Sequence, residues 1–583
     1  MEMSRKLHSE SNSDRISELP ESIRAHILSF LETKDAVRNS ILSSSWRGVP
    51  TWLPNLDLNS FYLHRSVMDD YLPDFDKDGD DASRVKRELI IRTREGFYAF
   101  LDRVFGSSSG LEKVKLCVPG FRNDMNSRVD HWLDGAVRRG VKELELKIGG
   151  QRGPRYVFPE SVLTANSVTK LKLQKCELSF TSLMDNKLPS LQELSLEDVC
   201  LNKMEVKTLL ASCINIKSFT LKNCDGLKTL EIVGLSKLEK VDVEHGDDVK
   251  VIKIDAPNLL EFRYMYTDGE SSCNTCCMEV EDCKSLKHLE LNCSHLDDND
   301  LEVLLEKSPL LEKLFLQNCD NLGYAEIYCQ HLVNLVFHNC RELVRVRAST
   351  PNLKFFTYMG EDPISFMSKG PALKLTHASL SLKPDFRNDK WFNGLIKLLA
   401  KLSHTESLTI EVASDKYVII PESVKTKSSP PLHAVKNLRV EFRLSGLKSP
   451  VEVVESLLWL APCPESISIS RDDCSGCKSI KFLYEKPLKG KKKCGCWKSS
   501  INCWRHSLKT VWIENQGSAK DDTKLVNFFE KRRIDGKIEC ITKNVMSKYG
   551  YGSGSGSESE CEFGYGSGFE SECEFGYGSE AEY

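Results

Sequence analysis

A short apolar pattern that recurs along the middle of the chain is the strongest constraint on its fold. Apolar residues occupy positions 1, 4 and 6 of each unit, and the units begin 21 to 30 residues apart. Positions 4 and 6 alternate with polar residues, so each unit predicts a short strand with one buried side. A unit this small can bury that side only by stacking on its neighbours, which predicts an elongated solenoid. The units begin at Leu111, Val141, Val168, Leu191, Ile216, Leu238, Leu259, Leu286, Leu311, Leu332 and Leu353.

Length and composition agree with an elongated array. The chain has 583 residues, too many for one compact core. Its net charge of −4 and its pI near 6.4 give no general attraction to nucleic acid or acidic membranes. No run approaches the ~18 apolar residues that span a bilayer, and the polar N-terminus lacks the apolar core of a secretory signal. We therefore expect a cytoplasmic or nuclear protein whose 22 cysteines are mostly thiols.

The ninth position of several units is a cysteine, which makes the array similar to leucine-rich repeats. Cys176, Cys224, Cys319 and Cys340 all stand there, where leucine-rich repeats place Asn or Cys at the turn that leaves the strand. We interpret these cysteines as structural turn residues and not as ligands. The predicted fold class is α/β: a small helical N-terminal domain followed by a leucine-rich-repeat solenoid with a parallel sheet on its concave face.

Positions 3, 5 and 7 of the units should point to the concave face. That surface is mixed in charge and carries a few aromatic groups, which suits a protein partner better than a phosphate backbone. For any single residue, a solvated sheet face is the simpler interpretation, so the hypothesis of binding rests on the whole surface. The candidate target-binding residues are Lys240, Asp242, His288, Glu290, Lys313, Phe315, Asn334 and His338.

The segment from residue 14 to residue 58 predicts a compact block of short helices. Leu19-Pro20 opens the first helix, and Asp35 can cap a second. A helical unit this small cannot bury all its apolar groups alone, so we expect another protein to cover some of them. The apolar residues in question are Leu19, Ile23, Ile27, Leu28, Leu31, Val37, Leu42 and Trp46.

This block resembles the F-box. The matching segments are Leu19-Pro20-Glu21, residues 27–31, residues 33–38, Leu42-Ser43 and Trp46-Arg47. The F-box docks on the small adaptor subunit of SCF-type cullin-RING ubiquitin ligases. The resemblance therefore implies contact with the adaptor and, through it, with cullin. The adaptor-binding residues that it implies are Leu19, Pro20, Ile23, Ile27, Leu28, Leu31, Val37, Leu42 and Trp46.

A second resemblance concerns the C-terminal part. Residues 451–545 resemble the FBD-type extension of plant F-box/leucine-rich-repeat proteins, mainly through Cys503-Trp504-Arg505-His506 and Leu508-Lys509. The expected organisation is a disordered N-terminus (1–13), an F-box (14–60), a connecting segment (61–105), the solenoid (106–450), the FBD-like region continuing it (451–545) and a disordered tail (546–583). The tail repeats ESECEFGYGS and cannot bury enough apolar surface to offset the entropy of ordering.

The resemblance implies a substrate-recognition subunit that positions a target and supplies no chemistry. The sequence has no Walker loop, dinucleotide fingerprint, HExxH or GxSxG motif, so we expect neither an enzyme nor a cofactor. A repeat scaffold that never joins a ligase is the alternative. It stays open because Ser44-Ser45 replaces the basic residues that F-boxes usually carry before Trp46-Arg47.

Two clusters raise the question of metals. Five thiols and one imidazole near the C-terminal end lie beside a lysine cluster. Together they raise a third hypothesis, that the chain is a zinc-dependent nucleic-acid-binding protein. We expect thiols without metal, because a two-zinc RING needs more ligands than the six present. The loop with Asp74, Asp76 and Asp78 has Val85 where calcium requires a bidentate carboxylate, which favours a solvated acidic loop. The six candidate zinc ligands are Cys474, Cys477, Cys494, Cys496, Cys503 and His506.

Overall fold

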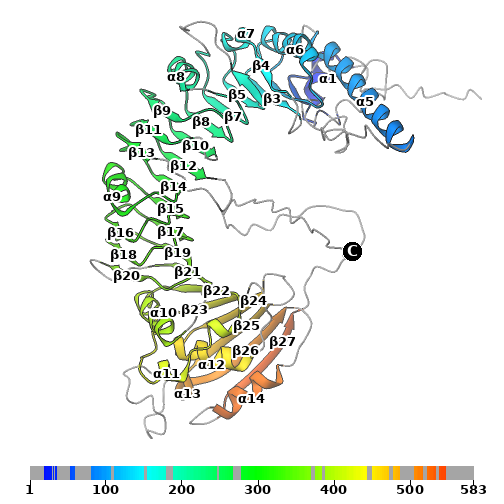
Figure 1. Ribbon diagram of the computed structural model, residues 1–583. Helices are drawn as coiled ribbons and strands as arrows, with labels where there is room; N and C mark the ends of the chain where they lie inside the picture. The colour runs from blue at the N-terminus through cyan, green and yellow to red at the C-terminus, as the bar shows by residue number, and fades with distance from the viewer. Residues whose placement is uncertain are drawn as a thin grey trace, which may run out of the picture.

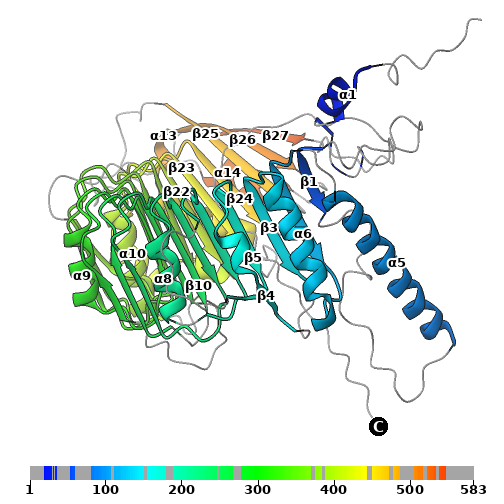
Figure 2. The same ribbon diagram turned by 90° about the horizontal axis from the view of Figure 1, so that it is seen from above.

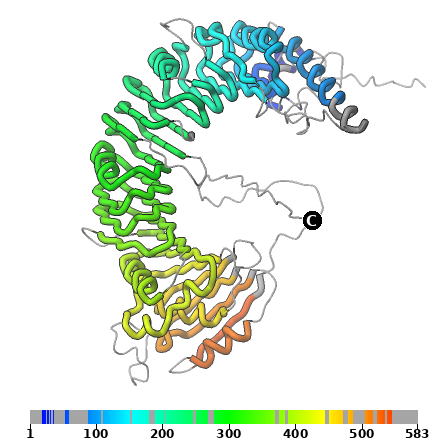
Figure 3. The backbone as a smooth tube through the Cα atoms, viewed as in Figure 1, coloured from blue at the N-terminus to red at the C-terminus, as the bar shows by residue number. Residues whose placement is uncertain are grey.

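The computed structural model forms an open arc whose inside is lined by one large sheet (Figures 1 and 3). The small helix α1 (Glu21–Leu28) and the long helix α5 (Asp81–Phe105) lie at one end of the arc. The other end carries α14 (Thr523–Arg532) and β27 (Glu539–Val545). The structure describes residues 19–28, 30–31, 33, 35, 53–58, 81–106, 110–149, 154–178, 188–201, 203–245, 249–266, 277–368, 375–383, 388–442, 449–471, 477–485, 504–516, 522–532 and 537–545.

The large sheet pairs its strands in the order of the chain, almost all of them in parallel. Figure 2 shows the strands side by side along the inside of the arc. Within the described residues they are β1 (Asn55–Leu58), β2 (Lys113–Val118), β3 (Glu143–Ile148), β5 (Lys170–Gln174), β7 (Glu193–Glu197), β8 (Ser218–Lys222), β10 (Lys240–His245), β12 (Glu261–Tyr266), β14 (His288–Asn292), β15 (Lys313–Gln317), β17 (Asn334–His338), β19 (Phe355–Gly360), β21 (His377–Leu382), β22 (Ser407–Val412), β23 (Asn437–Phe442), β24 (Ser466–Arg471), β25 (Cys477–Tyr484), β26 (Leu508–Gln516) and β27.

The apolar positions of the repeat form the core of the arc, as their spacing predicts. In the unit that contains β7, Leu191, Leu194 and Leu196 are all buried, and Leu194 lies in register with Leu171 and Phe219 on the neighbouring strands. Each repeat therefore covers the apolar side of the one before it. Burial of apolar area along the stack is the main force that holds such an array together.

The outside of the arc is covered by helices and by short strands that the sequence pattern did not predict. The short strands form separate parallel sheets, and they alternate buried and exposed residues as the inner strands do. They are β4 (Tyr156–Phe158) with β6 (Cys176–Leu178); β9 (Thr229–Val233), β11 (Val251–Asp255) and β13 (Cys277–Val280); and β16 (Tyr324–Ile327), β18 (Arg345–Ala348) and β20 (Ser365–Ser368). The further helices are α6 (Asn126–Arg138), α7 (Glu160–Leu163), α8 (Lys203–Ser212), α9 (Asp298–Lys307), α10 (Asp389–Lys401), α11 (Glu422–Lys425), α12 (Pro450–Leu460) and α13 (Trp504–Ser507).

The turn that leaves each inner strand explains the cysteines at position 9. The residue before the cysteine adopts a left-handed conformation in several units, with φ of 48° at Asn223, 49° at Asn318 and 56° at Asn339. This reverses the chain and turns the cysteine inward, where Cys176, Cys224, Cys319 and Cys340 are all buried. The Cys224 thiol donates to the carbonyl of Leu196 at 3.5 Å, and burial raises its pKa to about 12. These four cysteines are structural turn residues.

Both ends of the sheet differ from the expected organisation. The sheet begins with β1, inside the segment assigned to the F-box, and β1 pairs in parallel with β2. The long helix α5 occupies much of the expected connecting segment. At the C-terminal end the parallel pairing continues to β24, but β25 runs antiparallel to both β24 and β26. The FBD-like region thus extends the sheet with a different topology from the repeats.

Candidate functional site: a terminal helix and the inner face of the solenoid

Helix α1 presents part of an apolar face to solvent. The carbonyl of Pro20 accepts hydrogen bonds from the backbone amides of Ile23 (3.0 Å) and Arg24 (3.1 Å), which begins the helix. Ile23 and Ile27 lie one turn apart and are 45% and 41% exposed. Immediately after the helix, Leu31 is 42% exposed. Exposed apolar side chains grouped in this way mark a contact surface more often than a solvated one.

The opposite side of α1 attaches the helix to the solenoid. Leu28 is buried and belongs to the same apolar core as Leu56 and Leu58 of β1. The hydroxyl of Thr33 accepts a hydrogen bond from the backbone amide of Asp57 at 2.8 Å. Leu28 therefore serves the core of this chain, in contrast to its predicted role in adaptor contact.

The predicted adaptor-binding residues are only partly described. Leu19 is half-buried and Pro20 is exposed, whereas Val37, Leu42 and Trp46 lie outside the described residues. Phe30 was quoted in the F-box match but left out of the predicted contact residues. It is 77% exposed, and its ring meets His26 edge-on at 5.0 Å between centroids. Because Phe30 lies within the segment that matches the F-box, it could have been predicted as a contact residue from the sequence.

The predicted target-binding residues lie on the inner face, in rows across the strands. Lys240, His288, Lys313 and Asn334 belong to one row at position 3. Asp242, Glu290 and Phe315 belong to a second row at position 5, and His338 stands in the third, at position 7. Side chains from well-separated repeats therefore form one continuous surface.

Arg263 of β12 connects two of the predicted acidic residues. Its guanidinium lies 3.1 Å from the carboxylate of Asp242 and 3.5 Å from that of Glu290, since β12 separates β10 from β14. Arg263 is not among the residues predicted for this surface, although it occupies position 5 of the unit that begins at Leu259. A search of that unit by position would have found it.

Burial and neighbouring charges shift several pKa values on this surface. Burial raises the pKa of Glu290, and Arg263 only partly opposes this. Hydrogen bonding from Lys240 holds the pKa of Glu261 below its usual range. Burial, with Lys313 nearby, lowers the pKa of His288. The imidazole of His288 is therefore neutral at physiological pH, with one ring nitrogen able to donate and the other to accept.

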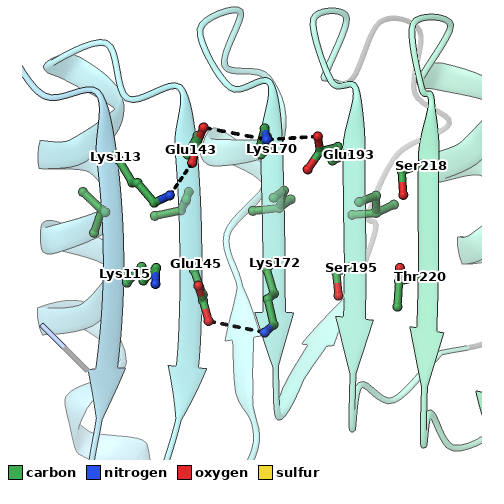
Figure 4. A pocket seen from close by; sticks show the side chains of 14 residues that line it. Lys113, Lys115, Glu143, Glu145, Lys170, Lys172, Glu193, Ser195, Ser218 and Thr220 are labelled. Carbon is green, nitrogen blue, oxygen red and sulfur yellow. Dashed lines mark ion pairs between the residues drawn. The ribbon is translucent and has the colours of Figure 1, made fainter. Parts of the chain in front are cut away.

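The N-terminal part of the inner face is a ladder of alternating charges around a shallow hollow of about 280 Å³ (Figure 4). In one row, Lys113 lies 2.8 Å from Glu143, and Lys170 lies 3.9 Å from Glu143 and 3.0 Å from Glu193. The next row pairs Lys172 with Glu145 at 3.4 Å. Exposed pairs of this kind contribute only about 0–1 kcal/mol each. Their main effect is to cancel one another's charge across the hollow.

Two of the six candidate zinc ligands lie within the described residues. Cys477 begins β25 and His506 belongs to α13, while Cys474, Cys494, Cys496 and Cys503 lie outside. The calcium-like loop with Asp74 and the C-terminal tail also lie outside. In the part of the chain that the structure covers, His, Cys, Asp and Glu form no cluster of three or more positioned to hold a metal ion. Among the same residues, no helix is both long and apolar enough to cross a membrane.

The curved array with a parallel sheet on its inner face defines a leucine-rich-repeat protein. Comparison with known proteins agrees. A family model described as the At1g61320/AtMIF1 LRR domain matches residues 106–274 and again residues 270–427, which together exceed half of the chain. The chain belongs to this leucine-rich-repeat family.

Curated relatives specify the class further. The chain is 29% identical over 268 residues to the F-box/LRR-repeat protein At3g58940 of Arabidopsis thaliana, a match that covers 43% of this chain and 40% of the relative. It is 27% identical to the putative F-box/LRR-repeat protein At5g38386 (52% and 74% covered) and 27% identical to the F-box/LRR-repeat protein At4g14096 (44% and 50% covered), both from the same plant. The chain thus spans half or less of the length of two of these relatives. With the repeat family, they identify it as a plant F-box/LRR protein.

Proposed function

We propose that this chain is the substrate-recognition subunit of an SCF-type cullin-RING ubiquitin ligase. Helix α1 contacts the adaptor subunit, and the inner face of the solenoid holds a target protein for ubiquitination. The observation that carries the proposal is the division of α1 into two sides. Leu28 fixes the helix to the solenoid, while Ile23 and Ile27 remain exposed together with Phe30.

The arrangement supports recognition by positioning. A target held on the inner face stays at a fixed distance from the adaptor end, which raises its effective concentration near the charged ubiquitin carrier. In this account the chain contributes geometry and binding surface, and the chemical groups come from other subunits. The names of the plant relatives agree with this role.

The test measures binding of the full chain to a purified SCF adaptor by calorimetry. Ile27→Asp should weaken binding at least tenfold, because it places a carboxylate in an apolar contact, and a loss of about 1.4 kcal/mol already corresponds to tenfold. The matched control is Ile214→Asp, in the turn before β8, where the isoleucine is 66% exposed. The control should bind as the parent does.

Three outcomes are informative. Loss of binding in Ile27→Asp alone supports the proposal. Equal binding by all three chains would place the adaptor contact elsewhere. Failure of the parent chain to bind would favour the scaffold that never joins a ligase, since the replaced basic residues at Ser44-Ser45 would then matter.

A further inference from the structure

One stretch of the inner face differs in chemistry from the rest. On strands β17, β19 and β21, positions 3 and 5 hold Asn334 and Val336, Phe355 and Thr357, and His377 and Ser379. Position 7 adds His338, Met359 and Ser381. None of these nine side chains is Asp, Glu, Lys or Arg. We call this surface the neutral tract.

Charged residues enclose the neutral tract on both sides. Towards the N-terminal end lie Lys313 and the group of Arg263 with Glu290. Towards the C-terminal end lie Glu411 and Arg439, of which Arg439 pairs with Glu441 at 2.6 Å. The ladder of β2 to β7, by contrast, carries a charge at most of its equivalent positions.

One aromatic ring lies beside the tract on β15, and another lies on its central strand, β19. Phe315 of β15 meets His288 at 5.3 Å between ring centroids, and Phe355 meets His377 at 6.3 Å. Phe355 is 43% exposed, although the adjacent Phe356 points into the core and is buried. Exposed aromatic side chains on a surface without charge are typical of the centre of a protein–protein interface.

Two polar atoms on this part of the inner face, one in the tract and one on β14, lack a hydrogen-bond partner in the described structure. The Ser381 hydroxyl and Nε2 of His288 are both shielded from solvent and make no hydrogen bond in the described structure. Ser381 itself is only 3% exposed. Buried polar atoms usually find a partner, so the Ser381 hydroxyl, which lies in the tract itself, is available to a donor or acceptor of a bound ligand.

We propose that the neutral tract, with Phe315 at its margin, is the part of the inner face that receives the target. Its occupant is an uncharged segment of the target protein that carries at least one large apolar side chain beside hydroxyl or amide groups. A charged side chain would lose its water there without meeting an opposite charge, which is costly. This inference rests on the proposed function, because it specifies what the inner face holds.

The experiment uses two pools of fluorescent peptides of about eight residues. An extended chain needs about six residues to cross the roughly 20 Å from β14 to β21, which leaves about one residue at each end. Both pools carry Phe, Leu or Trp at one central position. The neutral pool surrounds that position with Ser, Thr, Asn, Gln and Gly, and the charged pool with Glu and Lys. Binding to the full chain is followed by fluorescence polarisation at low and high salt.

The neutral pool should bind at least tenfold more tightly than the charged pool, with little change on raising the salt concentration. Phe315→Ser and Phe355→Ser should each weaken that binding about tenfold or more. The matched control is Tyr324→Ser on the outer strand β16, which removes a ring that is 51% exposed. It should leave binding unchanged.

Tighter binding of the charged pool than of the neutral pool would overturn the proposal. So would peptide binding that is weakened by Lys172→Ser and not by Phe355→Ser. Either result would favour the charge ladder as the binding surface. Absence of binding to either pool would also overturn it. Adaptor binding by the same variants reports on folding, because α1 lies far from the tract (Figure 1). A parent chain that binds neutral peptides but no adaptor would refute the proposed ligase function and leave this inference standing.

Discussion

At the scale of single residues, the turns leaving the strands depend on side chains that tolerate a left-handed backbone. Asn318 shows why Asn recurs there. Its φ is 49°, its amide donates to the side-chain oxygen of Asn292 at 3.2 Å, and its own oxygen accepts from the amide of Asn339 at 2.8 Å. The side chain therefore links three successive repeats while the backbone reverses.

Two substitutions of Asn318 separate the contribution of its backbone conformation from that of its side-chain hydrogen bonds. Asn318→Ala should lower the free energy of unfolding by about 2 kcal/mol, because it strains the left-handed backbone and removes the hydrogen bonds. Asn318→Gly should lower it by only about 1 kcal/mol, because glycine adopts this φ freely. Urea denaturation followed by circular dichroism measures both. An equal loss in the two variants would show that backbone conformation is not part of the effect.

At the scale of elements, α5 and α6 close the N-terminal end of the solenoid through one close approach. Gly135 of α6 lies so near the end of α5 that a Cβ atom there would come within 2.6 Å of the carbonyl oxygen of Phe105. Arg128 of α6 adds an ion pair to Asp102 of α5 at 2.8 Å. The packing of the two helices therefore requires glycine at this position.

Two glycine substitutions in these helices should have opposite effects. Gly135→Ala should destabilise the chain by about 1–3 kcal/mol, because the added methyl group meets backbone that cannot easily move. Gly96→Ala in α5 should stabilise it by about 0.5–1 kcal/mol, since no atom beyond the adjacent residues and the helix's own backbone lies within 4 Å of the added Cβ, and alanine favours the helix. Thermal melts of both variants provide the test. Stabilisation by Gly135→Ala would contradict the close approach.

At the scale of the whole molecule, the arc places two unlike surfaces at separate locations. Exposed apolar residues of α1 lie at one end, and the neutral tract lies beyond the middle of the inner sheet (Figure 1). The charge ladder and its hollow lie between them. A molecule built in this way can hold two partners at once, because neither surface overlaps the other.

Much of the repeat fold could be predicted from the sequence, because the buried positions of a repeat are periodic. Leu191, Leu194 and Leu196 are buried as their spacing indicates, and Cys176 lies at the predicted turn. The first strand of the sheet was missed even though Leu53, Leu56 and Leu58 occupy positions 1, 4 and 6. They were assigned to the neighbouring helical segment instead.

The candidate site was harder to predict for a physical reason. The pattern places Asn334 and Phe355 on the inner face, but it does not say which side chains of other repeats lie beside them. That depends on the pairing of strands from repeats of unequal length, which is how Arg263 comes to lie between Asp242 and Glu290. The outer strands such as β16, which have three to five residues each, were not predicted.

We propose that one chain holds an adaptor and a target at two independent surfaces. The most direct test measures the affinity of the neutral peptide pool for the chain with and without a saturating amount of purified adaptor. We expect the same affinity in both conditions and a complex that contains all three components, since separate sites without a shared element show little coupling. Loss of peptide binding when the adaptor is added would show that the two surfaces are not independent.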